Sequence, residues 1–164
     1  TCYPQERQQT KRMRQLFWMV GLWVVFSVTA CDHKVYDHYC HTPVAGWEKN
    51  DTLCYDIAPM QQQGMYQLGV GLRLSNAYPF MGITLIVEQT VWPQRRTLID
   101  TVECRLVGQH GKHKQHGISY FQYTQPIGKL SLLAGDSLHI TVRHDMQRDI
   151  LPGVSDVGIF MTKQ

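Results

Sequence analysis

With 164 residues and a formal net charge of +3 at pH 7, the chain is most simply one domain preceded by an N-terminal segment. Residues 1–30 hold four of the 16 Lys and Arg residues and one of the 13 Asp and Glu residues, so residues 31–164 hold 12 of each kind. The basic excess belongs to the N-terminal segment, and a nucleic-acid partner loses its main support.

The first element is an apolar run of 15 residues, LFWMVGLWVVFSVTA (16–30), which follows a cluster of basic residues. A membrane-spanning helix needs about 20 apolar residues, whereas the core of a signal peptide needs roughly 7–15. The run ends in VTAC, the aliphatic, small, small, cysteine order of a bacterial lipobox. We predict that residues 1–30 are a helical lipoprotein signal peptide cleaved after Ala30, and that Cys31 is lipidated. A short uncleaved anchor is the alternative.

Lipidation of Cys31 would fix the protein to a membrane, because several acyl chains hold far more firmly than one. The sequence begins with Thr1, and Met13 would open a compact leader, so we expect the residues before Met13 to lie upstream of the true start. The mature protein is then residues 31–164, which we expect to form a single domain.

Apolar and polar residues alternate along the mature chain, most clearly in YQLGVGLRL (66–74), where every second side chain is apolar or aromatic. Turn-forming residues separate eight such segments. The predicted strands are 35–39, 53–57, 66–74, 83–91, 97–107, 118–127, 137–144 and 156–163. Seven or eight strands without a convincing amphipathic helix predict an all-β, jelly-roll-like antiparallel β-sandwich.

Three histidines, His110, His113 and His116, are spaced three apart in GQHGKHKQHG (108–117). Imidazole binds many metals, and on a helix this spacing would place the rings near one face. However, the glycines favour a loop, the lysines would repel a cation, and no carboxylate lies nearby to complete a site. We predict a solvated hairpin tip and no metal site.

The segment RHDMQRDILPGVSD (143–156) gathers His144, Asp145, Asp149 and Asp156. A catalytic acid pair needs one carboxyl with a raised pKa, from an apolar pocket or a like-charged neighbour. The two arginines of the segment favour ionised carboxylates instead, so we predict a structural role. An enzyme would require a cleft that joins Asp145, Asp149 and a histidine. The chain contains no GxSxG, HExxH, P-loop or GxGxxG motif, and we predict no catalytic residue and no cofactor.

Aromatic residues near turns support an alternative function, a β-sandwich that binds a glycan or another ligand in the envelope. Trp47, Trp92 and Tyr78 are the candidates for a stacking platform, and we expect Trp47 and Trp92 to be exposed. If they bind a ligand together, these rings should be coplanar on one exposed face. Burial would favour a scaffold.

The chain has five cysteines, with no CxxC and no Cys/His spacing typical of zinc. Removal of Cys2 with the leader and acylation of Cys31 would leave Cys40, Cys54 and Cys104. An exported compartment permits one disulfide among these three. One disulfide and three reduced thiols are both consistent with the sequence.

Four stretches follow one another behind the lipobox: CDHKVYDHY from Cys31, GWEKNDTLCYDI (46–57), YQLGVGLRLSNAYPFMGITLIVE (66–88) and LPGVSDVGIFM (151–161). In order and spacing they resemble the GldH family, the gliding-motility lipoproteins of Bacteroidetes. The resemblance covers essentially the whole mature chain.

The resemblance implies a non-enzymatic accessory lipoprotein of the gliding apparatus and its associated protein-secretion machinery. It implies a lipid anchor at the outer membrane, with the periplasmic and the surface face both open. Partners would be the membrane and other envelope motility or secretion proteins. It implies no active site.

The implied lineage adds one expectation. Exported Bacteroidetes proteins are similar in being O-glycosylated at Asp-Ser/Thr-apolar triplets, and three such triplets place acceptors at Thr52, Thr101 and Ser137. The alternative is that these triplets simply lead from a turn into a strand. That alternative suits Thr52 and Ser137 better than Thr101, which lies within a predicted strand.

Overall fold

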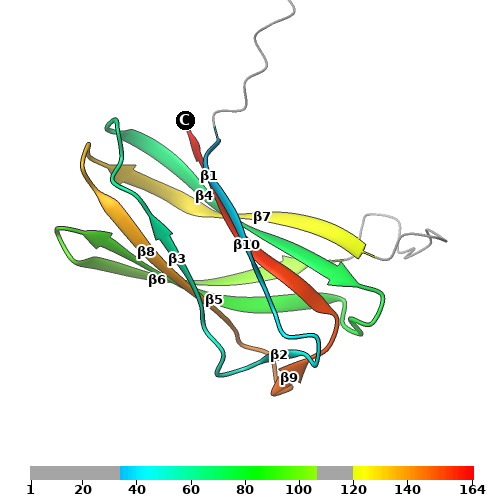
Figure 1. Cartoon of the computed structure of the whole chain (residues 1–164). Helices are drawn as coiled ribbons and strands as arrows, with labels where there is room; N and C mark the ends of the chain where they lie inside the picture. The colour runs from blue at the N-terminus through cyan, green and yellow to red at the C-terminus, as the bar shows by residue number, and fades with distance from the viewer. Residues whose placement is uncertain (1–33, 107–119) are drawn as a thin grey trace, which may run out of the picture. The chain divides into compact units, whose positions relative to one another are not determined.

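The computed structural model describes residues 34–106 and 120–164, and this part of the chain contains ten β-strands and no helix (Figure 1). None of the described residues forms a helix that could cross a membrane. The predicted leader and the histidine segment at 108–117 lie outside the described residues. The strands are β1 (Lys34–His41), β2 (Trp47–Glu48), β3 (Leu53–Ile57), β4 (Gly64–Ser75), β5 (Gly82–Trp92), β6 (Arg96–Arg105), β7 (Tyr120–Leu132), β8 (Ser137–His144), β9 (Ile150–Leu151) and β10 (Val154–Lys163).

Eight of the strands form two four-stranded antiparallel sheets in a sandwich-like arrangement (Figure 1). The order is β1-β10-β4-β7 in the first sheet and β3-β8-β5-β6 in the second, and β2 pairs separately with β9. The predicted all-β antiparallel sandwich is therefore confirmed. The sequence pattern missed the short β2–β9 pair, because two-residue strands are too short to show alternation.

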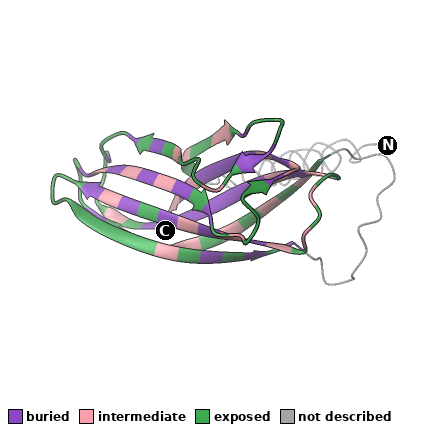
Figure 2. Ribbon diagram, turned by 90° about the horizontal axis from the view of Figure 1, so that it is seen from below, coloured by how far each residue is buried: buried purple, intermediate pink, exposed green. Residues whose placement is uncertain are grey.

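The core lies between the sheets and follows from the alternation, which Figure 2 shows as bands along the strands. In β4, five alternate side chains are buried: Tyr66, Leu68, Val70, Leu72 and Leu74. Strand β8 contributes Leu138, Ile140 and Val142 from the second sheet. Each such buried aliphatic side chain contributes about 1.5–3 kcal/mol relative to an exposed one.

The outer face of the first sheet is covered by aromatic rings that lie over glycines. The ring of Tyr39 lies so close to Gly71 that a Cβ added there would collide with the phenol. The guanidinium of Arg73 lies over this ring, with Cζ 4.2 Å from the ring centroid. Glycine at 71 is thus required by the close approach of the ring.

The strand registers define two ends of the sandwich. One end lies beyond the row Lys34, Thr162, Gln67, Lys129 in the first sheet, and beyond the row Ile57, Leu138, Val91, Arg96 in the second. We term it the near end, because β1, the strand closest in sequence to Cys31, begins there. The near end comprises Lys34 and residues 57–67, 91–96, 129–138 and 162–164. The opposite end, the far end, carries the β2–β9 pair and the 76–81 loop.

Candidate functional site

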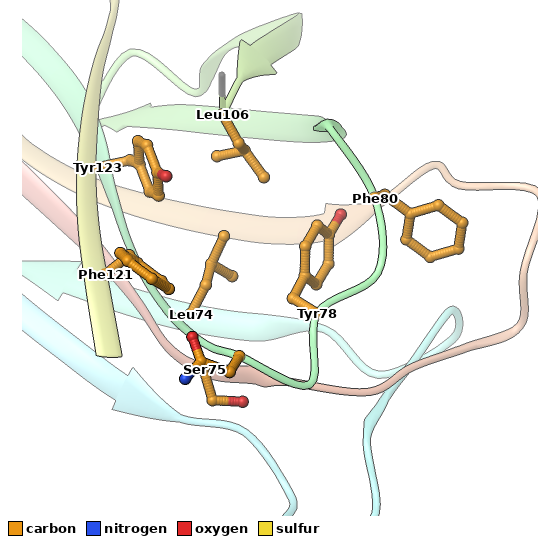
Figure 3. Close-up of a pocket in the computed structure, with 8 residues that line it drawn as sticks. Leu74, Ser75, Tyr78, Phe80, Leu106, Phe121 and Tyr123 are labelled. Atoms are coloured by element: carbon orange, nitrogen blue, oxygen red, sulfur yellow. The ribbon is translucent and has the colours of Figure 1, made fainter. Parts of the chain in front are cut away.

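The far end holds a cleft of about 220 Å³ at the start of β7 (Figure 3). The rings of Phe121 and Tyr123 form one wall and the ring of Tyr78 forms the other, while Leu74 and Leu106 lie between them. Ser75, Asn76 and Phe80 complete the lining. The start of β7 places Phe121 and Tyr123 opposite Leu74 and Leu72 of β4, and the loop that follows β4 carries Tyr78.

Tyr78 is held in place by its own loop. Its amide donates to the carbonyl of Ser75 at 3.1 Å, and its hydroxyl donates to the carbonyl of Gly82 at 2.9 Å. Burial raises the pKa of the Tyr78 phenol, so the ring stays neutral. Tyr78 is therefore a fixed wall with its polar atom already satisfied.

Tyr123 differs from Tyr78 in this respect. Its ring lies on the inner side of β7, opposite Leu72 of β4, and is half-buried. No residue in the described ranges forms a hydrogen bond with its hydroxyl, whose oxygen points into the cleft (Figure 3). The cleft can thus receive an apolar or ring-shaped group and offer it one hydroxyl.

A second depression, of about 310 Å³, adjoins the cleft at Phe121 on the outer face of the first sheet. It is lined by polar groups, among them Arg73, Gln122 and Asp156. Asp156 is only 5% exposed; its carboxylate accepts a hydrogen bond from Ser155 at 2.9 Å and faces Nδ1 of His41. The far end thus places an apolar cleft beside a polar, charged surface.

The three predicted stacking residues lie in three different places. Trp47 is fully buried, so the prediction that it is exposed is wrong. Its Nε1 donates to the Asp51 carbonyl at 3.0 Å, and its ring packs edge-on against His144 with centroids 5.1 Å apart. Trp92 is 41% exposed, as predicted, and lies at the near end. Tyr78 lines the cleft, so the three rings form no common platform, which favours the scaffold interpretation.

Trp92 borders a shallow depression of about 400 Å³ on the outer face of the second sheet. His139 and Asp56 also line this depression, with 2.6 Å between Nδ1 of His139 and Oδ1 of Asp56. The guanidinium of Arg95 covers the Trp92 ring at 4.9 Å from its centroid, and the backbone of Arg95 is left-handed (φ 54°). A non-glycine residue in this conformation is uncommon.

The structure does not gather the acidic segment into an active site. His144 is fully buried, with Nε2 donating to the Trp47 carbonyl at 3.2 Å and Nδ1 accepting from the Met146 amide at 3.4 Å. This pattern fits the neutral imidazole, and burial lowers the pKa of His144. Asp145 points instead toward Lys49, with 3.8 Å between Nζ and Oδ1, and Asp149 is exposed.

The three described cysteines are free thiols: Cys40 is half-buried, Cys54 exposed and Cys104 buried. Burial raises the pKa of Cys104 to about 11, which leaves it a poor nucleophile. Within the described residues, no group of three or more His, Cys, Asp or Glu side chains is placed to hold a metal ion.

The predicted modification sites fall into two groups. Ala30 and Cys31 lie outside the described residues. Thr52 and Thr101 are exposed, whereas Ser137 is half-buried at the edge of the Trp92 depression.

The sequence analysis did not identify the aromatic cleft as a site. The available signal was that alternation turns Phe121 and Tyr123 to the same side of β7, next to the loop containing Tyr78.

The described residues that line the cleft include no carboxylate, imidazole, amine or guanidinium. Fold and site together define a β-sandwich protein with an aromatic cleft. The chain belongs to the GldH lipoprotein family, whose model matches residues 34–161, and the predicted family is confirmed. This family is implicated in gliding motility.

Two curated relatives match most of the chain. The gliding motility lipoprotein GldH of Flavobacterium johnsoniae is 26% identical over 137 residues, covering 79% of this chain and 85% of the relative. The GldH homolog of Christiangramia forsetii is 26% identical over 154 residues, covering 88% and 93%.

The matches to solved structures are more distant. A family GH115 4-O-methyl-α-glucuronidase has a TM-score of 0.46 at 14% identity, covering 83% of this chain and 18% of the glucuronidase. A carbohydrate-binding module of Cellvibrio mixtus lichenase 5A has a TM-score of 0.38 at 12% identity, covering 81% and 92%. Likenesses at this level carry no argument about function.

Proposed function

We propose that this chain is a non-enzymatic accessory lipoprotein of the gliding apparatus and its associated secretion machinery, anchored at the outer membrane through acylated Cys31. The observation that carries the proposal is the position of the family match. It begins at residue 34, three residues after the lipobox cysteine, and both curated relatives are named gliding motility lipoproteins.

The far end is the surface we propose for protein partners. Strand β1 starts at the near end, so an anchor on Cys31 places the near end toward the membrane and leaves the far end projecting from it. The far end offers an apolar cleft beside polar groups, which is the composition of a protein-binding surface with a buried centre and a polar rim. Other envelope proteins of the motility or secretion machinery would dock there.

The anchor is tested by labelling the bacterial host with radioactive palmitate and comparing wild type with Cys31→Ser. We expect the label to be lost in the variant, because the thiol is the acceptor of the lipid. Unchanged labelling would end the lipoprotein proposal, whatever the role of the domain.

The partner surface is tested by crosslinking intact envelopes and purifying the chain with whatever is bound to it. Recovery of gliding or secretion components supports the proposal, and their loss in Tyr123→Ala assigns them to the cleft. Ile99→Ala is the matched control, because Ile99 is 65% exposed on the second sheet, away from the cleft lining. Recovery of polysaccharide-uptake proteins alone would count against the proposal.

We also propose O-glycosylation at Thr52 and Thr101 ahead of Ser137. The first two side chains are exposed, whereas Ser137 is half-buried. Its neighbour Asp136 turns inward, with its carboxylate accepting hydrogen bonds from Gln94 at 2.9 Å and from the Leu133 amide at 2.9 Å. Intact mass of the protein from its host decides the question: a mass of polypeptide plus lipid alone would exclude glycosylation.

A further inference from the structure

The near end of the described domain carries an excess of basic residues. The near end holds five basic residues and one acidic residue, Asp136, which is buried at 5% exposure. Two further carboxylates lie just outside it and are paired, Asp37 with Lys34 at 3.0 Å and Asp56 with His139 at 2.6 Å. The remaining described residues hold five basic and ten acidic residues. The basic residues of the near end are Lys34, Arg95, Arg96, Lys129 and Lys163.

This polarity is a product of the fold. The five basic residues come from four strands and one turn, spread from position 34 to position 163. Strand register brings them together: Lys34 and Lys129 lie in one row across the first sheet, and Arg96 ends the corresponding row of the second. The domain is therefore close to neutral in total and yet positive at one end.

The positive end is also the end from which the chain leads back to Cys31. Only Asp32 and His33 separate Cys31 from Lys34. A step of three residues spans at most about 11 Å even when fully extended. Any membrane that holds acyl chains on Cys31 is thus within reach of the near end.

The apolar side chains exposed at the near end suit an interface with lipid headgroups. Trp92 is 41% exposed, Met65 45% and Leu133 56%. Tryptophan is enriched at membrane interfaces because its ring is apolar and its N–H is polar, and Arg95 lies directly over this ring. The far end also exposes apolar side chains, such as Met81 and Val44, so exposed apolar side chains alone do not distinguish the near end. Its excess of basic residues distinguishes it from the rest of the described residues.

We infer that the near end is a membrane-contact surface, which lies on the anionic headgroups of the bilayer that holds the Cys31 anchor. The inference rests on the proposed lipidation and adds an orientation to it. Basic residues within a Debye length of an anionic surface are attracted to it, and a basic patch commonly acts together with a lipid anchor. The far end then faces away from the membrane.

The two tryptophans of the mature chain provide the test, because Trp18 and Trp23 lie within residues 1–30. The acylated protein is purified from its host, its mass is checked, and it is reconstituted into vesicles of phosphatidylglycerol and brominated phosphatidylcholine. Bromine quenches tryptophan only at short range. Trp92, at the near end, should be quenched, while Trp47, buried at the far end, should not. Trp92→Phe should therefore remove more than half of the quenching.

Charge variants separate attraction by the near end from general attraction. R95E/R96E/K129E should lower the quenching of Trp92 at least twofold, and so should high salt. R105E/R143E/R148E is the matched control, since it changes the net charge equally at exposed sites outside the near end and should leave quenching unchanged.

The outcomes distinguish the inference from its premise. A mature chain without acyl mass would overturn the anchor and the orientation together. An acylated chain whose Trp92 stays unquenched and open to aqueous acrylamide would overturn the orientation alone. Quenching that responds equally to both charge triples would also overturn it, because the near end would then have no special role.

Discussion

The two ends of the sandwich differ in what their side chains are used for. At the far end, Trp47 and His144 are buried against each other, while β7 and the 76–81 loop leave an aromatic cleft. At the near end, tight turns close the sheets, Trp92 lies on the surface, and five basic residues gather. The two proposals made above follow this difference, since they assign the far end to a protein partner and the near end to a membrane.

Replacing each tryptophan by alanine should give the largest contrast between the ends. Trp47→Ala should lower the free energy of unfolding by about 3–5 kcal/mol, because a fully buried ring is lost and its contact with His144 with it. Trp92→Ala should cost less than about 1 kcal/mol, because the ring is 41% exposed. Urea denaturation of the two variants measures both. Equal losses would mean that the ends are not packed as described.

Asp136 should account for the next largest effect, at the near end. Its carboxylate ties the β7–β8 turn to Gln94 of the β5–β6 turn, so Asp136→Ala should cost about 1–3 kcal/mol through the unsatisfied donors. The hydrogen bond from Gln94 is the main cause that lowers the pKa of Asp136.

The pH dependence of Asp136 has a definite sign. A carboxyl whose folded-state pKa is lowered stabilises the fold above the unfolded value, which is near 3.8, and this stability is lost as the pH falls through the folded-state pKa. Thermal unfolding between pH 5 and pH 2 should therefore show a smaller acid loss in Asp136→Asn than in the wild type. An equal loss of stability between pH 5 and pH 2 in the two proteins would contradict a lowered pKa for Asp136.

His144 should give a smaller pH effect at the far end. Burial lowers its pKa below the ordinary value of 6.5, so the unfolded chain takes up the proton first as the pH falls. The stability due to the neutral ring is complete above about pH 6.5 and declines as the pH falls from there through the folded-state pKa. Denaturation at pH 7.5 and pH 5 should show this decline, and His144→Gln should flatten it. A difference in stability between wild type and His144→Gln that stays the same at pH 7.5 and pH 5 would contradict a neutral His144.

The strands could be predicted because alternation is local. In Tyr66 to Leu74 and in 137–144, the polarity of each side chain indicates whether it faces the core or the solvent. The observed strands there match the predicted ones closely. The burial of Trp47 could not be predicted, because it depends on pairing with Leu151 more than a hundred positions later. The gathering of basic residues at the near end could not be predicted for the same reason, because Arg95 and Lys129 lie far apart in the sequence and share no local pattern.

The cleft lies between these two cases. Alternation already turns Phe121 and Tyr123 inward on β7, but nothing local indicates that the ring of Tyr78 lies across from them. A sequence reports which face a side chain occupies, whereas a cleft depends on which segments of the chain come to lie around it.

The smallest effect we expect comes from the two tyrosines that face each other across this cleft. Tyr78→Phe should cost about 0.5–1.5 kcal/mol of stability, because the hydroxyl loses its hydrogen bond to the Gly82 carbonyl at 2.9 Å. Tyr123→Phe should cost less than about 0.5 kcal/mol, because no described residue accepts from or donates to its hydroxyl. If Tyr123 serves a partner, the same change should weaken crosslinked recovery of that partner while the unfolding curve stays in place. A loss of stability in Tyr123→Phe equal to that in Tyr78→Phe would mean that the Tyr123 hydroxyl is engaged within the domain and is not available to a partner.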